Sequence, residues 1–142
     1  MKAYSNHEMI EKARSVLNPR ELGHGNSAGD VACALLTTGG NLYYGVCIEI
    51  SSGIGFCAEH AAIAAMVTAG ESAIAKIVAV WDEGTVLPPC GRCREFMYQV
   101  DETNYENCEV ILGEDQAVRL KDLLPHPWHE VWQDGAGLIN ER

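Results

Sequence analysis

Three cysteines and one glutamate in this chain have the types and spacing that metal-assisted hydrolysis requires. Cys57 precedes Glu59 by two positions, and Cys90 and Cys93 follow later in the sequence. A structural zinc site uses four protein ligands, whereas a catalytic site uses three and leaves the fourth position to water. We therefore predict that the three cysteines bind zinc and that Glu59 carries protons beside the metal without binding it. The expected chemistry is hydrolysis.

Helix starts are the elements expected to position these side chains. Cys90 and Cys93 are three residues apart, so they share one helix face, and Cys57 opens an alanine-rich run that predicts a second helix. Helix N-termini favour negative charge through their free N–H groups and the macrodipole. Zinc with three thiolates has a formal charge of about −1, so further positive charge is expected from Arg92 and Arg94.

The Cys-x-x-Cys pair alone is also typical of a redox pair, a fragment of a structural zinc site or two core thiols. Two neighbouring features favour the catalytic interpretation, namely the Cys-Ala-Glu run at 57–59 and the proline Pro89 before Cys90. Zinc deaminases have the pattern His or Cys, any residue, Glu, and later Pro-Cys-x-x-Cys, with the glutamate as acid and base. The sequence fits the three-cysteine form of this pattern.

The chain resembles the cytidine deaminase family, and within it the blasticidin-S deaminase-like members. The resemblance rests on the zinc motif, on Gly-Val-Cys-Ile-Glu at 45–49 and on Pro-Cys-Gly-Arg-Cys-Arg-Glu at 89–95, and it runs from about Asp30 to Pro125. It implies a three-layer α/β/α sandwich with a mixed central sheet, and a homotetramer whose active sites are completed by neighbouring subunits. It also implies zinc-dependent hydrolytic deamination of the cytosine moiety of a free nucleoside, with release of ammonia. The expected substrate is cytidine or deoxycytidine, or alternatively a cytosine nucleoside antibiotic such as blasticidin S.

The resemblance also implies roles for single residues. Glu59 would accept the proton of water and deliver protons to the ring and the leaving amino group, and the backbone N–H of Ala58 would help to bind the base. Glu49 would accept a ribose hydroxyl, although a solvated carboxylate at a strand end is the alternative. Cys47 stands where cytidine deaminases have an asparagine, and a thiol is a weak donor and acceptor.

Three further positions differ from the pattern of ordinary cytidine deaminases. Gly29 stands where a phenylalanine stacks on the pyrimidine. Arg92 would either clamp a substrate carboxylate or neutralise the thiolates, and both alternatives stay open. His60 replaces an arginine that supports the zinc thiolates, and a neutral imidazole would do this only in part, with its one N–H donor. His60 is not expected to be a zinc ligand.

Composition limits the partners. The net charge is −10, with ten Lys and Arg among twenty Asp and Glu. Nucleic-acid binding depends on basic clusters, so the charge favours a small free substrate over DNA or RNA. We expect one domain over residues 1–142, no membrane-spanning run and no secretion signal. The six cysteines then favour a cytoplasmic location, where thiols stay reduced.

The predicted elements follow the order β-β-α-β-α-β after a first helix. Hydrophobic spacing and turn residues give a helix over 5–17, a loop over 20–29, strands over 31–37 and 42–50, a strand over 77–81, a loop over 82–89, and strands over 109–112 and 118–120. Cys33 and Cys108 are expected to be buried small hydrophobic residues, and residues 134–142 to be weakly ordered.

Three functions remain compatible with the sequence. The first is a deaminase of a free cytosine nucleoside, and the second is a deaminase of another amino-heterocycle, suggested by the missing asparagine and phenylalanine. The third is a zinc protein without catalysis. Glu59 argues against the third, because a structural zinc site needs no carboxylate there.

Overall fold

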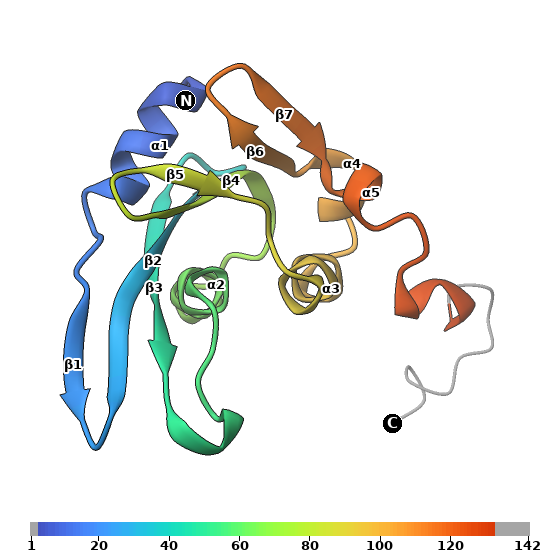
Figure 1. Ribbon diagram of the computed structural model, residues 1–142. Helices are drawn as coiled ribbons and strands as arrows, with labels where there is room; N and C mark the ends of the chain where they lie inside the picture. The colour runs from blue at the N-terminus through green and yellow to red at the C-terminus, as the bar shows by residue number, and fades with distance from the viewer. Residues whose placement is uncertain (1–2, 133–142) are drawn as a thin grey trace.

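The computed structural model describes residues 3–132 and shows a sheet with helices on both faces (Figure 1). The helices are α1 (Asn6–Arg14), α2 (Ala58–Thr68), α3 (Gly91–Val100), α4 (Asn104–Asn107) and α5 (Leu120–Leu123), with 3₁₀ turns at Ser51–Gly53 and Trp128–Trp132. The strands are β1 (Arg20–Gly23), β2 (Asn26–Thr37), β3 (Leu42–Glu49), β4 (Ile74–Trp81), β5 (Thr85–Leu87), β6 (Glu109–Gly113) and β7 (Gln116–Arg119). No helix within residues 3–132 is long and apolar enough to cross a bilayer. The residues 134–142, which the sequence predicts to be weakly ordered, lie outside the described part.

The long strand β2 organises the sheet. It pairs with β3 along one edge and with β1 and β4 along the other, and the order continues through β6 to β7. The β4–β6 pair is parallel and the other pairs are antiparallel. The predicted mixed sheet is therefore confirmed.

Two hydrophobic cores lie on opposite faces of this sheet, because successive strand residues point to opposite sides. On β2, Cys33 and Leu35 pack with α2 and α3, whereas Ala32 and Ala34 pack with α1. Figure 1 shows α1 on one side of the sheet and α2 with α3 on the other. This is the expected three-layer α/β/α sandwich. Cys33 and Cys108 are both fully buried, as predicted.

The predicted loop over 20–29 is wrong, because this segment forms a hairpin. β1 pairs with the start of β2, which begins at Asn26 rather than at residue 31. The turn between them holds three successive residues, Gly23 to Gly25, at positive φ, a conformation that two glycines make accessible. Every residue of β1 is exposed, so the strand has no apolar alternation by which sequence reasoning could find it.

The predicted loop over 82–89 likewise contains the short strand β5, which pairs with the end of β4. Asp82 and Gly84 turn the chain with positive φ. The first helix, predicted over 5–17, ends at Arg14. Its N-terminus agrees with the prediction, because the Ser5 hydroxyl accepts a hydrogen bond from the Glu8 N–H at 3.0 Å.

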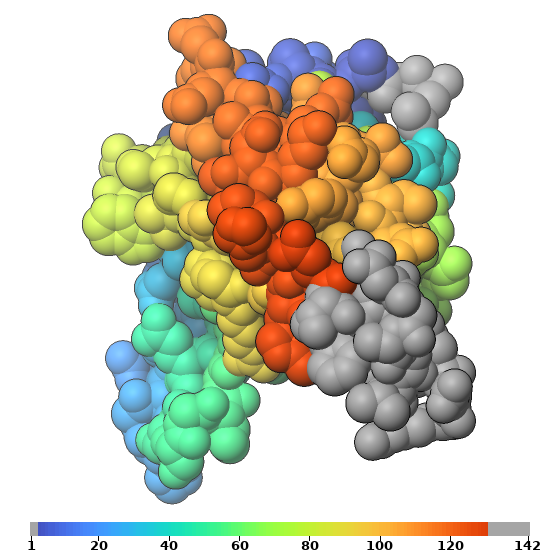
Figure 2. Space-filling model, turned by 90° about the vertical axis from the view of Figure 1, so that its right-hand side faces the viewer, coloured from blue at the N-terminus to red at the C-terminus, as the bar shows by residue number. Residues whose placement is uncertain are grey.

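The C-terminal part of the described chain packs against α3 and α4. Arg94 donates to the Leu123 carbonyl at 3.0 Å, the Tyr105 hydroxyl donates to the Leu124 carbonyl at 3.0 Å, and the Trp128 N–H donates to Glu95 at 2.7 Å. Figure 2 shows this segment, in orange-red, lying over the yellow and gold residues of α3 and α4. These contacts hold α3, whose N-cap residue is Cys90.

Candidate active site

The three predicted ligand cysteines meet at the starts of two neighbouring helices. Cys57 is the N-cap residue of α2 and Cys90 is the N-cap residue of α3, as the sequence predicts, and Cys93 lies in the first turn of α3. The sulfur of Cys90 lies 3.6 Å from that of Cys57 and 3.5 Å from that of Cys93. The tertiary structure thus brings together thiols from two segments separated by β4 and β5.

The geometry of this trio fits zinc. A tetrahedral ion with Zn–S bonds of about 2.3 Å places neighbouring sulfur atoms about 3.8 Å apart. All three sulfur atoms lie within 4.8 Å of one another, and neither Glu59 nor His60 joins the group. A set of three thiolates with no fourth protein ligand among the described residues is the arrangement of a catalytic zinc site.

The pKa values of the thiols reflect their burial and their crowding. Burial raises the pKa of Cys57 and that of Cys93, and the negative charge of Glu59 raises the Cys93 value further. Burial acts in the same direction on Cys90, but hydrogen bonds, first from the Cys93 backbone N–H, lower its pKa overall. Thiols that resist ionisation become thiolates when a divalent cation binds, because the ion is the largest charge in the site.

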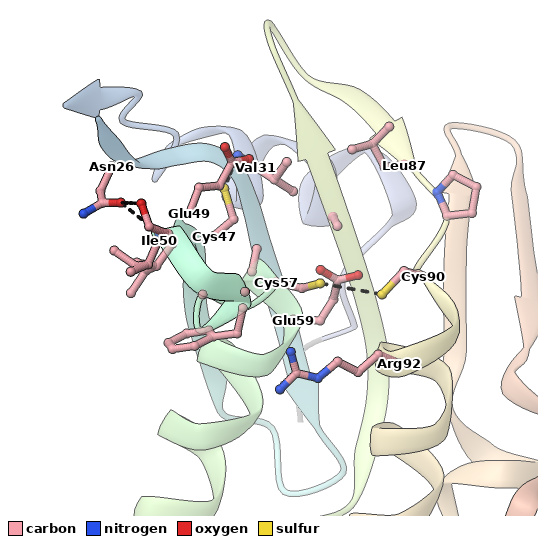
Figure 3. A pocket seen from close by; sticks show the side chains of 18 of the residues that line it. Asn26, Val31, Cys47, Glu49, Ile50, Cys57, Glu59, Leu87, Cys90 and Arg92 are labelled. Carbon is pink, nitrogen blue, oxygen red and sulfur yellow. Dashed lines mark hydrogen bonds between the residues drawn. The ribbon is translucent and has the colours of Figure 1, made fainter. Parts of the chain in front are cut away.

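Glu59 is placed beside the sulfur atoms, as predicted. Its side chain is only 5% exposed, and Figure 3 shows its carboxylate next to Cys57 and Cys90. Burial raises the pKa of this carboxyl, and hydrogen bonds from its own N–H and from Cys93 oppose the rise only in part. A carboxyl with a raised pKa is suited to moving protons near neutral pH.

A cavity of about 660 Å³ opens above the sulfur atoms and Glu59 (Figure 3). Cys47, Glu49, Ala58 and Arg92, which the resemblance gives as substrate-binding residues, all line it. The remaining lining residues come from the β1–β2 turn, from β2 and β3, from the segment between β3 and α2, and from the region of β4 and β5: Gly25, Asn26, Val31, Ile48, Ile50, Ser51, Gly53, Gly55, Phe56, Ala79, Leu87, Pro88. Sequence reasoning missed Asn26, because it lay inside the predicted loop.

At the end of the cavity formed by β2 and β3, Cys47 stands in place of the asparagine that the family pattern has there. The Cys47 sulfur accepts a hydrogen bond from the Val31 N–H at 3.3 Å, at an irregular stretch of the β2–β3 pairing. The carboxylates of Asp30 and Glu49 lie within 4.8 Å of this sulfur and of each other. The Cys47 sulfur is therefore engaged by a backbone N–H, and Asp30, which is not among the lining residues, places a second carboxylate beside Glu49 that the motif did not reveal.

Gly29 cannot carry the aromatic ring that ordinary cytidine deaminases have at this position. Its φ is +86°, and a Cβ atom would lie 1.9 Å from the carbonyl oxygen of Asn18. The chain passes too close to itself at this point for any side chain. No aromatic side chain can therefore contribute to the cavity from this position.

The two arginines of the motif have different positions. Arg92 lines the cavity, and Figure 3 shows its guanidinium below Glu59. Arg94 instead donates to the carbonyls of Pro89, at 2.8 Å, and Leu123. Its guanidinium thus bonds to carbonyl oxygens on either side of α3, and its part in neutralising the thiolates stays a prediction. His60 places Nδ1 3.3 Å from the Cys93 sulfur.

Known proteins share both the sequence motif and the fold. The profile of the cytidine and deoxycytidylate deaminase zinc-binding region matches residues 5–106. The chain is 32% identical to the cytidine deaminase of Mycobacterium tuberculosis (strain CDC 1551 / Oshkosh) over 97 residues, which cover 67% of this chain and 69% of that relative.

Solved structures agree with this match. A crystal structure of cytidine deaminase from Mycobacterium tuberculosis matches with a TM-score of 0.74 and 25% identity, over 89% of this chain and 98% of the other. Cytidine deaminase from Burkholderia pseudomallei matches with a TM-score of 0.68 and 25% identity, over 88% and 100% of the two chains. The finer resemblance to blasticidin-S deaminase-like members stays a prediction. The chain belongs to the cytidine and deoxycytidylate deaminase family and is a zinc-dependent hydrolytic deaminase.

Proposed function

We propose that this protein deaminates the cytosine moiety of a free nucleoside. Cytidine and deoxycytidine are the first candidates, and a cytosine nucleoside antibiotic such as blasticidin S belongs to the same class. The observation that carries this proposal is the buried Glu59 beside three clustered thiols, at the end of a cavity large enough for a nucleoside. The net charge of −10 supports a free substrate over a nucleic acid.

Each residue of the site has a role in this reaction. Cys57, Cys90 and Cys93 would hold zinc, which when bound supplies a water of lowered pKa. Glu59 accepts a proton from water as the oxygen bonds to C4 of the ring. It delivers this proton to ring N3. It then takes the second water proton from the hydroxyl group now on C4 and passes it to the amino group, so that the C4–N bond breaks, C4 becomes a carbonyl and ammonia leaves. The N–H of Ala58, in the first turn of α2, helps to hold the base.

The other end of the cavity would hold the sugar. Glu49 lines it and would accept a hydroxyl hydrogen bond. Cys47 already accepts the Val31 N–H, so its sulfur has little capacity left for the substrate. Arg92 is the one cationic side chain among the lining residues within 3–132, and it would face either the thiolates or an anionic group of the substrate.

Ammonia release from the zinc-loaded protein tests the proposal. The compounds are cytidine, deoxycytidine, cytosine, blasticidin S and adenosine, and we expect release from at least one cytosine nucleoside. Glu59→Gln should retain one zinc per chain and lose at least about 10²–10⁴-fold in kcat, because both proton transfers depend on the carboxylate. Normal turnover by Glu59→Gln, or its failure to bind zinc, would overturn the role of Glu59.

A second candidate is deamination of another amino-heterocycle. The specific observations in its favour are the occupied Cys47 sulfur and the closed position at Gly29, which both depart from the cytidine pattern. Cys47→Asn separates the two candidates. A gain in cytidine turnover would show that the site still binds a ribose and has lost only the asparagine contact to it. No gain, together with release from an amino-purine, would favour the second candidate. Ammonia release from none of these compounds, with zinc bound, would point to an amino-heterocycle outside this set.

We also propose that the chain forms a homo-oligomer, with a tetramer as the expected state. Helix α2 is apolar on its outer face as well as its inner one, since Ala64, Ala65 and Val67 are exposed. A helix that is apolar all round is usually buried, and a second copy would cover it. Light scattering should give about four times 15.5 kDa, and Val67→Glu should lower that mass. A monomeric wild-type protein would refute this.

A cytoplasmic location is part of the same proposal. All six cysteines are free thiols, which supports a reducing environment where three of them stay available to a metal. Fractionation of cells that express the full chain tests this.

A further inference from the structure

We infer that Asn26 is a positioning residue that fixes one wall of the cavity and thereby sets the affinity for the sugar end of the substrate. The inference rests on the proposed function. Asn26 is the first residue of β2 and lines the cavity. The wall is the chain between β3 and α2, residues 50–56, and it contributes five lining residues: Ile50, Ser51, Gly53, Gly55, Phe56.

The pairing of β2 with β3 brings Asn26 to this wall. The first paired residues of β2 and β3 are Ser27 and Glu49, so Asn26 lies one position beyond the ladder, where the chain leaves β3. Its Oδ1 accepts the Ser51 N–H at 3.0 Å and the Ser51 hydroxyl at 3.3 Å. Figure 3 shows this contact near Glu49 and on the far side of the cavity from Cys90. Asn26 therefore acts at the end of the cavity that would hold the sugar.

The donors of Ser51 fix the orientation of the Asn26 amide. A backbone N–H can only donate, so the atom that faces it must be the amide oxygen. Within residues 3–132, these two bonds are the only side-chain hydrogen bonds from another segment to the wall. An aspartate at position 26 could supply the same acceptor, whereas an alanine could not.

The middle of the wall has a backbone conformation that needs support from outside. Ser52 and Gly53 both have a φ of +67°, and for a serine this left-handed conformation is unfavourable. The next residue, Ile54, is 72% exposed, so packing of its side chain contributes little. A residue persists in such a conformation where the surrounding structure determines it. The hydrogen bonds between Asn26 and Ser51 supply this support from β2.

The end of the wall next to the metal ligands is fixed independently of Asn26. The N–H groups of Ile48 and Phe56 each donate to the carbonyl of the other residue at 3.0 Å. Gly55 packs closely here, since a Cβ atom would lie 2.1 Å from the Ile48 oxygen. Cys57 directly follows Phe56 in the chain. Loss of the Asn26 contact should therefore move the sugar end of the wall and leave the cysteine in place.

Steady-state kinetics on the best cytosine nucleoside tests the inference. Asn26→Ala removes the acceptor and should raise KM about 2–10-fold, the effect of losing a hydrogen bond, while kcat and zinc affinity stay unchanged. Asn26→Asp keeps an acceptor oxygen and should bring KM back close to wild type. Ser51→Ala loses only the 3.3 Å bond and should give a smaller rise. Asn26→Val, whose side chain suits a strand, replaces the alanine variant if that variant does not fold.

Hydrogen exchange gives a readout that does not depend on turnover. Amide exchange is measured by mass spectrometry on peptides that cover residues 49–55 and 42–48. We expect Asn26→Ala to lose protection in the first peptide, which contains the Ser51 N–H, and to keep it in the second, whose Ile48 N–H bonds to Phe56. Asn26→Asp should match wild type in both peptides.

The inference and the proposed function fail in different ways. An unchanged KM in Asn26→Ala, or an equal rise of KM in Asn26→Asp, would overturn the inference. A fall in kcat with loss of zinc would also overturn it, because the whole site would then have moved. A protein that deaminates none of the compounds would refute the function, and exchange would still decide whether Asn26 holds the wall. Wild-type exchange in Asn26→Ala of an active protein would refute the inference alone.

Discussion

Replacing Gly45 with alanine should displace α2, because β3 and α2 touch at this glycine. A Cβ atom at this position would lie 2.3 Å from the Ala62 nitrogen, 2.5 Å from the Ala58 oxygen and 2.6 Å from the Ala61 Cβ. The two shortest distances are to backbone atoms, which cannot rotate away. Since ordinary contacts begin at 3.4 Å, the helix must retreat by about 1 Å.

This displacement should affect both activity and stability. Cys57 and Glu59 lie at the N-terminus of α2 and move with it, whereas Cys90 and Cys93 stay with α3. A misplacement of about 1 Å can cost about 10²-fold in rate. Overpacking of this kind costs about 1–3 kcal/mol in the free energy of unfolding. We expect kcat/KM for the best substrate to fall about 100-fold, together with weaker zinc binding.

The assay compares Gly45→Ala with Gly113→Ala in kcat/KM, zinc content and urea midpoint. Gly113 is the matched control, because a Cβ atom there meets nothing within 4 Å. The control should behave as wild type in all three measurements. Wild-type activity and zinc affinity in Gly45→Ala, with an unchanged urea midpoint, would refute the reasoning that this close contact positions the ligand helix.

Three further perturbations test the fold and the metal site. Asn104→Ala should cost about 2–4 kcal/mol in the free energy of unfolding. This buried amide donates to the Met97 carbonyl at 2.9 Å and bonds to two further backbone groups. An unchanged urea midpoint would contradict this expectation. The Thr103 hydroxyl donates to the Asp101 carboxylate at 2.6 Å and holds the pKa of Asp101 below its usual value. The stabilisation by this carboxylate is therefore present above about pH 4 and is lost as pH falls through the lowered pKa. The stability gap between wild type and Asp101→Asn should therefore narrow from pH 5 to pH 3 in urea titrations, and a constant gap would be the contrary result. Free zinc at 100 times its Kd should add about 2.7 kcal/mol to the free energy of unfolding of wild type, and most of that gain should vanish in Cys90→Ser, as thermal melts with and without a chelator would show.

The sequence by itself determined the chemistry of the site and the general architecture. Cys57 and Glu59 are close in sequence, as are Cys90 and Cys93, so each pair shares one helix turn whatever the rest of the fold does. Continuous apolar runs likewise predicted the buried strands, because strands covered on both faces, such as β2 and β4, have buried residues at successive positions. The family match and the mixed three-layer sheet confirmed these expectations.

Sequence reasoning did not find the exposed strands β1 and β5. β1 has no buried side chain, so hydrophobic spacing carries no information about it, and β5 is a three-residue strand within a turn-rich stretch. Their pairing depends on backbone hydrogen bonds to β2 and β4, which any residue type except proline can make.

Only the tertiary structure decided how the two halves of the site meet. The contact of His60 with Cys93, the stacking on Phe96 and the close approach at Gly45 all join elements that are distant in sequence. Such contacts depend on how α2 and α3 pack on the sheet to within about 1 Å, and residue types and spacing do not specify packing at that scale. The bonding of Arg94 to carbonyl oxygens has the same origin, because the chain after β7 provides one of its acceptors.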